Sequence, residues 1–327
     1  MIDIYFEPNY GKICEKIENG KCEIFEYSSG LGTVYHMFIK REIDTKIDDT
    51  VWYDLITPYG YGGPIIKECK KDHRTELIKE FEREFTKYCK KNRVVSEFIR
   101  FHPILENAND FKNMYDVSYI RNTVGTNLAD FDDPFQSEFS KSCRKSVRRG
   151  LKAGVTYRII ESPNDIKDFK KIYYSTMDRN EASDYYYFED NYFEECLDKF
   201  KDHVILVEAV YEGKVIAAGF YFVYRDIIHA HISGTLTDYL YLSPAYIIKY
   251  ATVMWGKSKN LSLIHYGGGI SNSDDDPLYK FKRKFGKNTE FKFYIGKKIW
   301  NEEIYQKLCK IKGIGDSIDY FPAYREK

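Results

Sequence analysis

The sequence predicts an α/β (α+β) protein of two similar domains, each with a mixed, mostly antiparallel sheet flanked by helices. Two observations predict this class. Segments rich in β-branched and aromatic residues alternate with segments whose apolar residues recur at helical spacing, and the same outline occurs in both halves of the chain. At 327 residues, the chain is long enough for two domains that each bury a core. We therefore expect one domain at residues 1–153, a second at 154–300, and a C-terminal helix and tail at 301–327.

The first half has strand-like segments on either side of an amphipathic helix. The amphipathic helix is expected at Arg74–Lys91, where one face carries Leu77, Ile78, Phe81, Phe85 and Tyr88. A second helix is expected at Phe135–Lys152, with an apolar stripe repeated every four residues from Phe139. The expected strands are Cys22–Tyr27, Val34–Lys40, Val51–Ile56, Val94–Phe101 and Tyr115–Asn122.

The second half contains a three-strand meander between helices. Tight turns at Glu212-Gly213 and Arg225-Asp226 separate its strands, which are Val204–Tyr211, Lys214–Tyr224 and Ile227–Gly234. Further strands are expected at Val155–Ile160, Leu261–His265 and Thr289–Ile295. Helices are expected at Asp165–Arg179, Phe188–Phe200, Pro244–Lys259 with Ser243 as its N-cap, from Asp276 onward, and at Asn301–Ile311.

Composition excludes several function classes. Fifty basic and fifty acidic residues give no net charge, so no whole-molecule field draws the chain to DNA, and any anion site must be local. No run approaches the roughly 18 apolar residues of a membrane helix, and the N-terminus lacks the apolar core of a signal peptide. Seven scattered cysteines form no CxxC pair, which argues against a zinc site or disulfides. We expect a cytoplasmic protein with reduced thiols, no bound metal, no DNA partner and no integral membrane segment.

The most informative segment is HYGGGISNSDDDPLYKFKRKFG, His265–Gly286. An expected strand ends in three glycines, Gly267–Gly269, and a polar loop leads to Asp276 and Pro277, which suit the N-cap and first residue of a helix. Bare backbone beside a cationic helix can hold an anion or a carbonyl group. The plainer interpretation is a tight turn followed by a solvated basic helix. That helix carries four cations between its apolar residues, namely Lys280, Lys282, Arg283 and Lys284.

Three segments together resemble the FemABX-like (peptidoglycan bridge peptidyltransferase-like) branch of the GNAT acyltransferase superfamily. They are the glycine segment above, YDLITPYGYGGPII at Tyr53–Ile66, and the basic stretch KSCRKSVRRGLKAGVTYRII at Lys141–Ile160. The resemblance implies tandem GNAT-like domains, a last helix that packs back on the first domain, and transfer of an acyl group to an amine. The order of elements expected in the second half is also that of the GNAT fold.

The resemblance assigns roles to two side chains of the second half. A lysine at the position of Lys282 stabilises charge on the reacting or acceptor carbonyl in the family, and Lys280 and Lys284 are rivals for that role here. An arginine at the position of Arg179 helps to hold the acceptor's phosphates, although the residue type alone also fits an exposed helix end. His231 is a general-base candidate by residue type, and a polar patch on one face of the sheet is the simpler interpretation.

Substrate-binding candidates complete the expected site. Arg144 and Arg148 lie on a basic helix that can contact phosphates or form a solvated outer face. The resemblance places the PYGYGG loop at the cleft between the domains, where it serves binding or only turn chemistry. The full set of expected substrate-binding residues is Tyr59, Tyr61, Gly62, Gly63, Arg144, Arg148, Arg179, Tyr185, Gly268 and Gly269.

A missing motif indicates the acyl donor. GNAT enzymes that use acyl-coenzyme A usually carry an R/QxxGxG/A loop before the central helix, whose backbone N–H groups hold the pyrophosphate. The corresponding stretch, Thr235–Ile248, contains no glycine. This favours aminoacyl groups from charged tRNA over acetyl-CoA, with no tightly bound cofactor and with a phosphate-bearing small-molecule acceptor.

The leading interpretation is an acyltransferase that joins an aminoacyl or similar group to an amine on a cell-wall precursor or sugar nucleotide. One alternative is an N-acetyltransferase that uses acetyl-CoA on an amino sugar or amine. The other is a non-catalytic GNAT-like binding protein. The absent coenzyme A loop argues against the first alternative, and the intact glycine and FKRKFG elements argue against the second.

Overall fold

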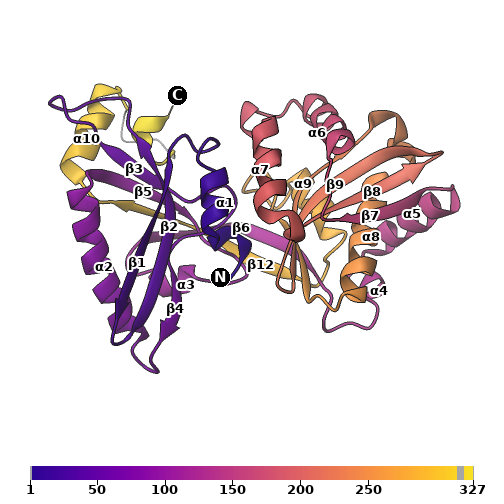
Figure 1. Ribbon diagram of the computed structural model, residues 1–327, viewed down its shortest axis with the longest axis horizontal. Coiled ribbons are helices and arrows are strands. Elements are labelled where there is room, and N and C mark those ends of the chain that lie inside the picture. Colours follow the sequence, from indigo (N-terminus) through magenta and orange to yellow (C-terminus); the bar gives the residue numbers. More distant parts are fainter. Residues whose placement is uncertain (1, 315–319, 327) are drawn as a thin grey trace. The chain divides into compact units, whose positions relative to one another are not determined.

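The computed structural model describes residues 2–314 and 320–326 and divides the chain into two compact units (Figure 1). The first unit comprises Met1–Ile120 together with Lys292–Lys327, and the second comprises Arg121–Phe291. The chain passes between the units along two strands, β6 (Asp116–Asn127) and β12 (Glu290–Ile299). The first unit is therefore built from two stretches of chain that are far apart in the sequence.

Five strands join β12 in the sheet of the first unit. They are β1 (Lys21–Ser29), β2 (Gly32–Glu42), β3 (Tyr53–Ile56), β4 (Ile65–Cys69) and β5 (Val94–Arg100). The strand order is β1-β2-β3-β5-β12, with β4 paired to β2. Among these strands only β3 and β5 run parallel, and the other pairs are antiparallel.

Five more strands join β6 in the sheet of the second unit. They are β7 (Thr156–Glu161), β8 (Val204–Tyr211), β9 (Lys214–Tyr224), β10 (Ile227–Thr235) and β11 (Leu263–Gly267). The strand order is β6-β11-β10-β9-β8-β7, and only β10 and β11 pair in parallel. Within the described residues, these strands belong to one twelve-stranded sheet that is mixed and mostly antiparallel in both units, which confirms the predicted fold class.

The helices of the first unit are α1 (Pro8–Ile13), α2 (Arg74–Lys91), α3 (Ala108–Phe111) and α10 (Glu302–Ile311). Helix α2 buries Leu77, Phe81 and Phe85 in the core of this unit, on the face that the sequence predicts. Helix α10 places Ile304 and Leu308 in a separate cluster with residues of β5 and the C-terminal segment.

The helices of the second unit are α4 (Pro134–Glu138), α5 (Lys141–Lys152), α6 (Lys167–Arg179), α7 (Asp190–Phe200), α8 (Pro244–Ser258) and α9 (Pro277–Arg283). Side chains alternate between the two faces of a strand, so neighbouring residues of β9 show which helix covers which face. Phe220 contacts Phe169 of α6 and Phe193 of α7, whereas the ring of Tyr221 lies under Lys249 of α8. Helices α6 and α7 thus cover one face, and α8 covers the other.

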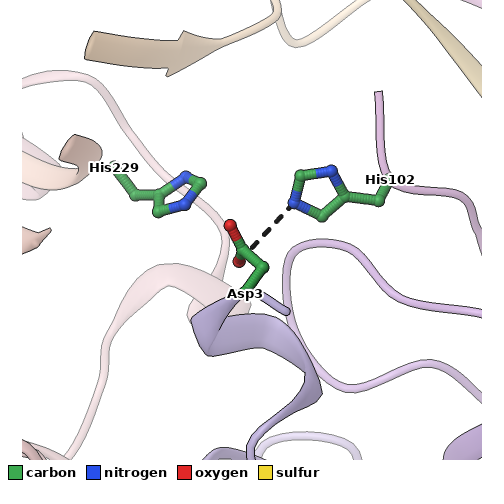
Figure 2. Close-up of side chains that lie close together, drawn as sticks. All are labelled: Asp3, His102 and His229. Carbon is green, nitrogen blue, oxygen red and sulfur yellow. Dashed lines mark ion pairs between the residues drawn. The ribbon is translucent and has the colours of Figure 1, made fainter. Parts of the chain in front are cut away.

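A polar pair anchors the first residues of the chain within the first unit. One carboxylate oxygen of Asp3 accepts a hydrogen bond from the backbone N–H of Tyr5 at 3.1 Å and begins the short 3₁₀ helix Ile4–Phe6. The same oxygen lies 3.6 Å from Nε2 of His102. Figure 2 marks this ion pair with a dashed line. This ion pair joins the N-terminal segment to the loop that follows β5.

Two local predictions are wrong. The expected helix Phe135–Lys152 is broken into α4 and α5, because Phe139 is extended and the Ser140 side chain begins a new helix by accepting a hydrogen bond from the N–H of Cys143. Ser243 does not cap α8 through its side chain. It adopts a left-handed conformation, with φ of +58°, and its hydroxyl oxygen accepts from Arg149 instead.

The structure assigns residues 121–153 to the second unit, whereas the sequence suggested a boundary near residue 153. Helix α5 packs against α8. The contact is close enough that a Cβ at Gly150 would lie 3.2 Å from the Cδ1 atom of Ile247 in α8. A division after residue 153 would separate these packed elements. The spacing of apolar residues along the chain does not reveal that α5 packs against α8.

Across residues 2–314 and 320–326, no helix has both the length and the apolar character needed to cross a membrane.

Candidate active site in the second unit

The loop after β11 is organised around the carboxylate of Asp276. This buried carboxylate accepts hydrogen bonds from the N–H of Ile270 at 3.0 Å, from the N–H and hydroxyl of Ser271 at 2.8 and 3.0 Å, and from the N–H of Tyr279 at 2.8 Å. The last contact is the helix N-cap that the sequence predicts. Burial acts to raise the pKa of Asp276, but these hydrogen bonds lower it to about 2. The carboxylate is therefore charged at neutral pH and holds the loop in place.

Two carbonyl oxygens of the glycine loop accept hydrogen bonds from cations. The Lys282 amine donates to Gly268 at 2.7 Å, and the Arg121 guanidinium donates to Gly269 at 2.6 Å. A Cβ at Gly269 would lie 2.4 Å from a carboxylate oxygen of Asp276, so this position requires glycine. The structure thus brings together Lys282, Gly268 and Gly269 among the residues predicted for the site.

Geometry separates Lys282 from its two rivals on α9. Lys280 is exposed and forms an ion pair of 2.6 Å with Asp275. The Lys284 amine donates to the Tyr246 hydroxyl at 3.1 Å. Of the three lysines, Lys282 is the one whose amine contacts the glycine loop.

The Lys282 amine is close to its titration midpoint at neutral pH. Burial, the ammonium of Lys249 and the guanidinium of Arg121 lower the pKa of Lys282 to about 7, although Asp276 acts in the opposite sense. Both protonation states are therefore populated near pH 7. An amine of this kind is suited to exchanging a proton with a substrate.

A second buried lysine, Lys249 of α8, was not identified from the sequence. Its amine donates to the Tyr221 hydroxyl at 3.1 Å and lies 5.0 and 5.3 Å from the ring centroids of Tyr221 and Tyr266. Burial lowers the pKa of Lys249 to about 7. The available signal was a single cation inside the otherwise uncharged stretch PAYIIKYATVMW, which begins at Pro244.

His231 lies in an aromatic environment beside α7. Its Nε2 is 2.6 Å from the Tyr192 hydroxyl, and its ring centroid is 5.0 Å from that of Phe222. Burial, with a smaller contribution from His229, lowers the pKa of His231 to about 3. An imidazole with this pKa is neutral at physiological pH and is a weak proton acceptor, so these surroundings favour a packing role over the predicted general base.

Arg179 and Tyr185 lie at the end of α6 and in the segment that follows it. The Arg179 guanidinium donates to the carbonyl oxygen of Thr235 at 2.7 Å and to the hydroxyl of Thr237 at 3.0 Å. Tyr185 is exposed and packs edge-on against Tyr186, with ring centroids 5.5 Å apart. Arg179 therefore fastens α6 to the end of β10, and a phosphate-binding role for it stays a prediction.

The two arginines predicted on the basic helix have different surroundings. Arg144 donates to the carbonyl oxygens of Gln136 and Phe139, across the break between α4 and α5. Arg148 is exposed, and its guanidinium carbon lies 5.8 Å from the ring centroid of Phe135. Arg144 thus stabilises the helix break, whereas Arg148 remains accessible on the outer face.

The glycines predicted as substrate-binding residues in the first unit are buried. The Gly62 carbonyl oxygen accepts from the Asn107 side chain at 2.9 Å. Gly63 has a φ of +85°, and a Cβ there would lie 2.8 Å from Ile99. Packing and turn conformation account for both glycines.

The two tyrosines of the same loop contact other aromatic residues of the first unit. The Tyr59 carbonyl oxygen accepts from the Tyr10 hydroxyl at 2.8 Å. The ring of Tyr61 packs edge-on against Tyr5, with centroids 5.4 Å apart. These contacts fix the loop, and substrate binding by either tyrosine stays a prediction.

The stretch before α8 uses its backbone N–H groups internally. After β10 the chain forms the 3₁₀ helix η4 (Thr237–Leu242). The N–H groups of Leu236, Ser243 and Tyr246 donate to carbonyl oxygens of the chain at 2.9 to 3.0 Å, and Pro244 has no N–H to offer. These N–H groups are therefore already used within the chain and are not available to hold a pyrophosphate as those of a glycine loop do.

Comparisons with known proteins agree with this architecture. Residues 137–283 match the family model described as an acetyltransferase (GNAT) domain. A UDP-N-acetylmuramoylpentapeptide-lysine N(6)-alanyltransferase from Weissella viridescens is 26% identical over 175 residues, which are 53% of this chain and 51% of that protein. The chain thus matches about half the length of this curated relative.

Solved structures share the fold across most of the chain. The crystal structure of FemX has a TM-score of 0.69 and 11% identity, and the match covers 93% of this chain and 94% of that one. The C-terminal domain of a putative lysylphosphatidylglycerol synthetase from Agrobacterium fabrum has a TM-score of 0.57 and 12% identity, and that match covers 95% and 98% of the two chains.

The mixed sheet and the lysine beside a glycine loop thus occur together with a sequence match to a GNAT acetyltransferase domain over residues 137–283. The matches to the alanyltransferase, to FemX and to the GNAT domain support the resemblance to the FemABX-like branch that the sequence motifs predict.

Proposed function

We propose that this protein is an acyltransferase that moves an aminoacyl group from charged tRNA to an amine on a cell-wall precursor. The observation that carries the proposal is the Lys282 amine. It is held 2.7 Å from the Gly268 carbonyl oxygen, and its pKa is about 7. A surface lysine keeps its proton at this pH, whereas Lys282 exchanges a proton readily.

The proposed reaction uses both protonation states of Lys282. The acceptor amine arrives as an ammonium and must lose a proton before its nitrogen can attack the ester carbonyl. Neutral Lys282 takes that proton, and the resulting ammonium stabilises the oxyanion that forms as the new C–N bond is made. The C–O bond to the donor then breaks, and the leaving oxygen takes up a proton to become a hydroxyl. The products are an amide, a free hydroxyl and one proton released to solvent.

The segment before α8 supports charged tRNA as the donor over acetyl-CoA. Its N–H groups at Leu236, Ser243 and Tyr246 already donate within the chain, and Pro244 occupies the first position of the helix. Acetyl-CoA would lack the pyrophosphate cradle that usually supplies much of its binding. We infer that acetyl-CoA binds weakly.

The acceptor class follows from the Weissella viridescens relative, whose name gives a UDP-linked muramoyl pentapeptide lysine as its acceptor. By analogy, we propose a peptide amine on a phosphate-bearing sugar nucleotide for this chain. Arg179 and Arg148 are the proposed phosphate contacts, and Tyr185 is a proposed aromatic contact. Arg179 uses one guanidinium nitrogen for Thr235 and Thr237, which leaves the other nitrogens for a ligand.

The test is a transfer assay on the purified protein with mass spectrometry of the acceptor. The assay supplies UDP-linked muramoyl pentapeptides with either a mixture of charged tRNAs or acetyl-CoA. We expect the acceptor to gain the mass of one aminoacyl residue with charged tRNA and nothing with acetyl-CoA. Acetylation of an amine would favour the acetyltransferase alternative. Acceptor binding without product from either donor would favour the non-catalytic binding protein.

A further inference from the structure

Lys249 is a cation in the core of the second unit that the proposed reaction does not use. Lys249 is 7% exposed, and it is the charged residue among the buried residues of α8. Within the described part of the chain, its amine has the Tyr221 hydroxyl as a hydrogen-bond partner and no carboxylate within ion-pair distance. An ammonium buried without a counter-charge is costly, so this position calls for a physical reason.

Lys249 and Lys282 flank the same short piece of backbone. The Lys249 amine lies 5.3 Å from the ring centroid of Tyr266, at the end of β11. Two residues further along, the Gly268 carbonyl oxygen accepts from the Lys282 amine at 2.7 Å. The two amines therefore approach residues 266–268 from different helices, α8 and α9. The positive charge of Lys249 is one of the causes that lower the pKa of Lys282, after desolvation.

We propose that Lys249 is a positioning residue for Lys282, and that the buried Lys249 amine and the partly buried Lys282 amine form an electrostatically coupled pair. Protonating one amine disfavours protonation of the other, because two like charges then share a poorly solvated site. The pair would leave one amine free to accept a proton from the acceptor. This inference rests on the proposed function for its purpose, although the coupling itself does not depend on it.

The other groups around the pair do not replace this coupling. Burial raises the pKa of both Tyr221 and Tyr266, so these hydroxyls remain neutral at pH 7. Arg121 adds a further positive charge near Lys282. Asp276 is the acidic group that acts on Lys282, and its carboxylate already accepts four hydrogen bonds from the glycine loop and α9.

The test follows the titration of Lys282 directly. The full chain is labelled with ¹³C-lysine, the Cε resonance of Lys282 is assigned by its loss in Lys282→Arg, and its shift is recorded against pH. Lys249→Met removes the neighbouring charge and keeps an unbranched apolar side chain of similar length. The matched control is Lys284→Met, because the Lys284 amine also donates to a tyrosine hydroxyl and lies two residues from Lys282 on the chain.

We expect the Lys282 midpoint to rise by about one unit in Lys249→Met and to move by less than about 0.3 unit in Lys284→Met. Lys249→Arg keeps the charge and should hold the midpoint at its low value. If Lys249→Met does not fold, Lys249→Gln removes the same charge while keeping a polar end. An unchanged midpoint in a folded charge-removing variant overturns the proposal.

The acyl-transfer assay then separates this inference from the proposed function. In Lys249→Met, the acidic limb of the kcat/KM profile should move to higher pH together with the Lys282 midpoint. A shifted midpoint in a protein that transfers no aminoacyl group would contradict the proposed function alone. Transfer by a protein whose midpoint does not shift would contradict the coupling alone.

Discussion

Lys282 and Lys284 are two residues apart on the chain, yet their amines have different chemical surroundings. The Lys282 amine donates to the carbonyl oxygen of Gly268, whereas the Lys284 amine donates to the hydroxyl of Tyr246. Residue type and spacing could not distinguish them, since each of the three lysines of KFKRK was a candidate for the role that the resemblance assigns. The contact with Gly268 distinguishes them, because it places the Lys282 amine at the glycine loop.

At this scale we predict that Lys282→Ala lowers kcat by roughly a hundredfold, which is typical for loss of one group that stabilises a transition state. Acceptor affinity should change little, because the proposed role acts during the reaction. Lys280→Ala is the matched control, since that lysine is exposed and pairs with Asp275. Steady-state kinetics on folded variants measure both values. Equal loss of activity in the two variants would show that the site is placed on the wrong lysine.

The glycine loop and α9 form one structural element because a single carboxylate links them. Asp276 caps the helix through Tyr279 and also binds the backbone of Ile270 and Ser271. Three consecutive glycines would otherwise be flexible. The element therefore holds the Gly268 carbonyl oxygen at a fixed place for Lys282, and the Asp276 carboxylate provides the rigidity.

For this element we predict that Asp276→Ala destabilises the protein by about 1–2 kcal/mol at pH 7, the range for loss of a helix cap. Folding lowers the pKa of Asp276 from 3.8 to about 2, so its contribution is complete above pH 4 and is lost as the pH falls toward 2. Urea denaturation of wild type and variant at pH 7 and pH 3 measures the difference, which should shrink at pH 3. Asp274→Ala, at an exposed neighbour, should match wild type at both values.

At the scale of the whole molecule, the first unit is completed only by the last part of the chain. β12 pairs with β5, and α10 supplies Ile304 and Leu308 to a cluster that includes Val95. The Arg325 side chain also forms an ion pair of 2.5 Å with the buried Asp54 of β3. Residues 1–120 therefore depend on residues that follow the entire second unit in sequence.

We predict that a fragment of residues 1–153 does not fold cooperatively, because it lacks β12, α10 and Arg325. A fragment of residues 121–291 should fold, since it keeps every strand pairing of the second sheet, from β6 at Val124–Asn127 to β7. Amide NMR dispersion and thermal melting of the two fragments measure this directly. A cooperative melt of the 1–153 fragment would support a domain boundary near residue 153.

The sequence by itself determined the elements whose signals are local. Helix α2, the meander β8–β10 and the cap at Asp276 all follow from periodicity, turn residues and capping, which act over a few positions. The sequence also contained the motifs by which the chain resembles the FemABX-like branch. β4 was not predicted, since Ile65–Cys69 is short and carries two charged residues that weaken the strand pattern.

The tertiary structure alone decided the features that depend on distant residues. The break before Ser140, the left-handed Ser243 and the assignment of α5 to the second unit depend on packing that no short window records. The same holds for Lys249 and Lys282, which are 33 positions apart. Burial lowers the pKa of Lys249 to about 7, and desolvation together with the charges of Lys249 and Arg121 lowers the pKa of the partly buried Lys282 to about 7. The sequence supplied the lysines, and burial in a shared environment gave them their chemistry.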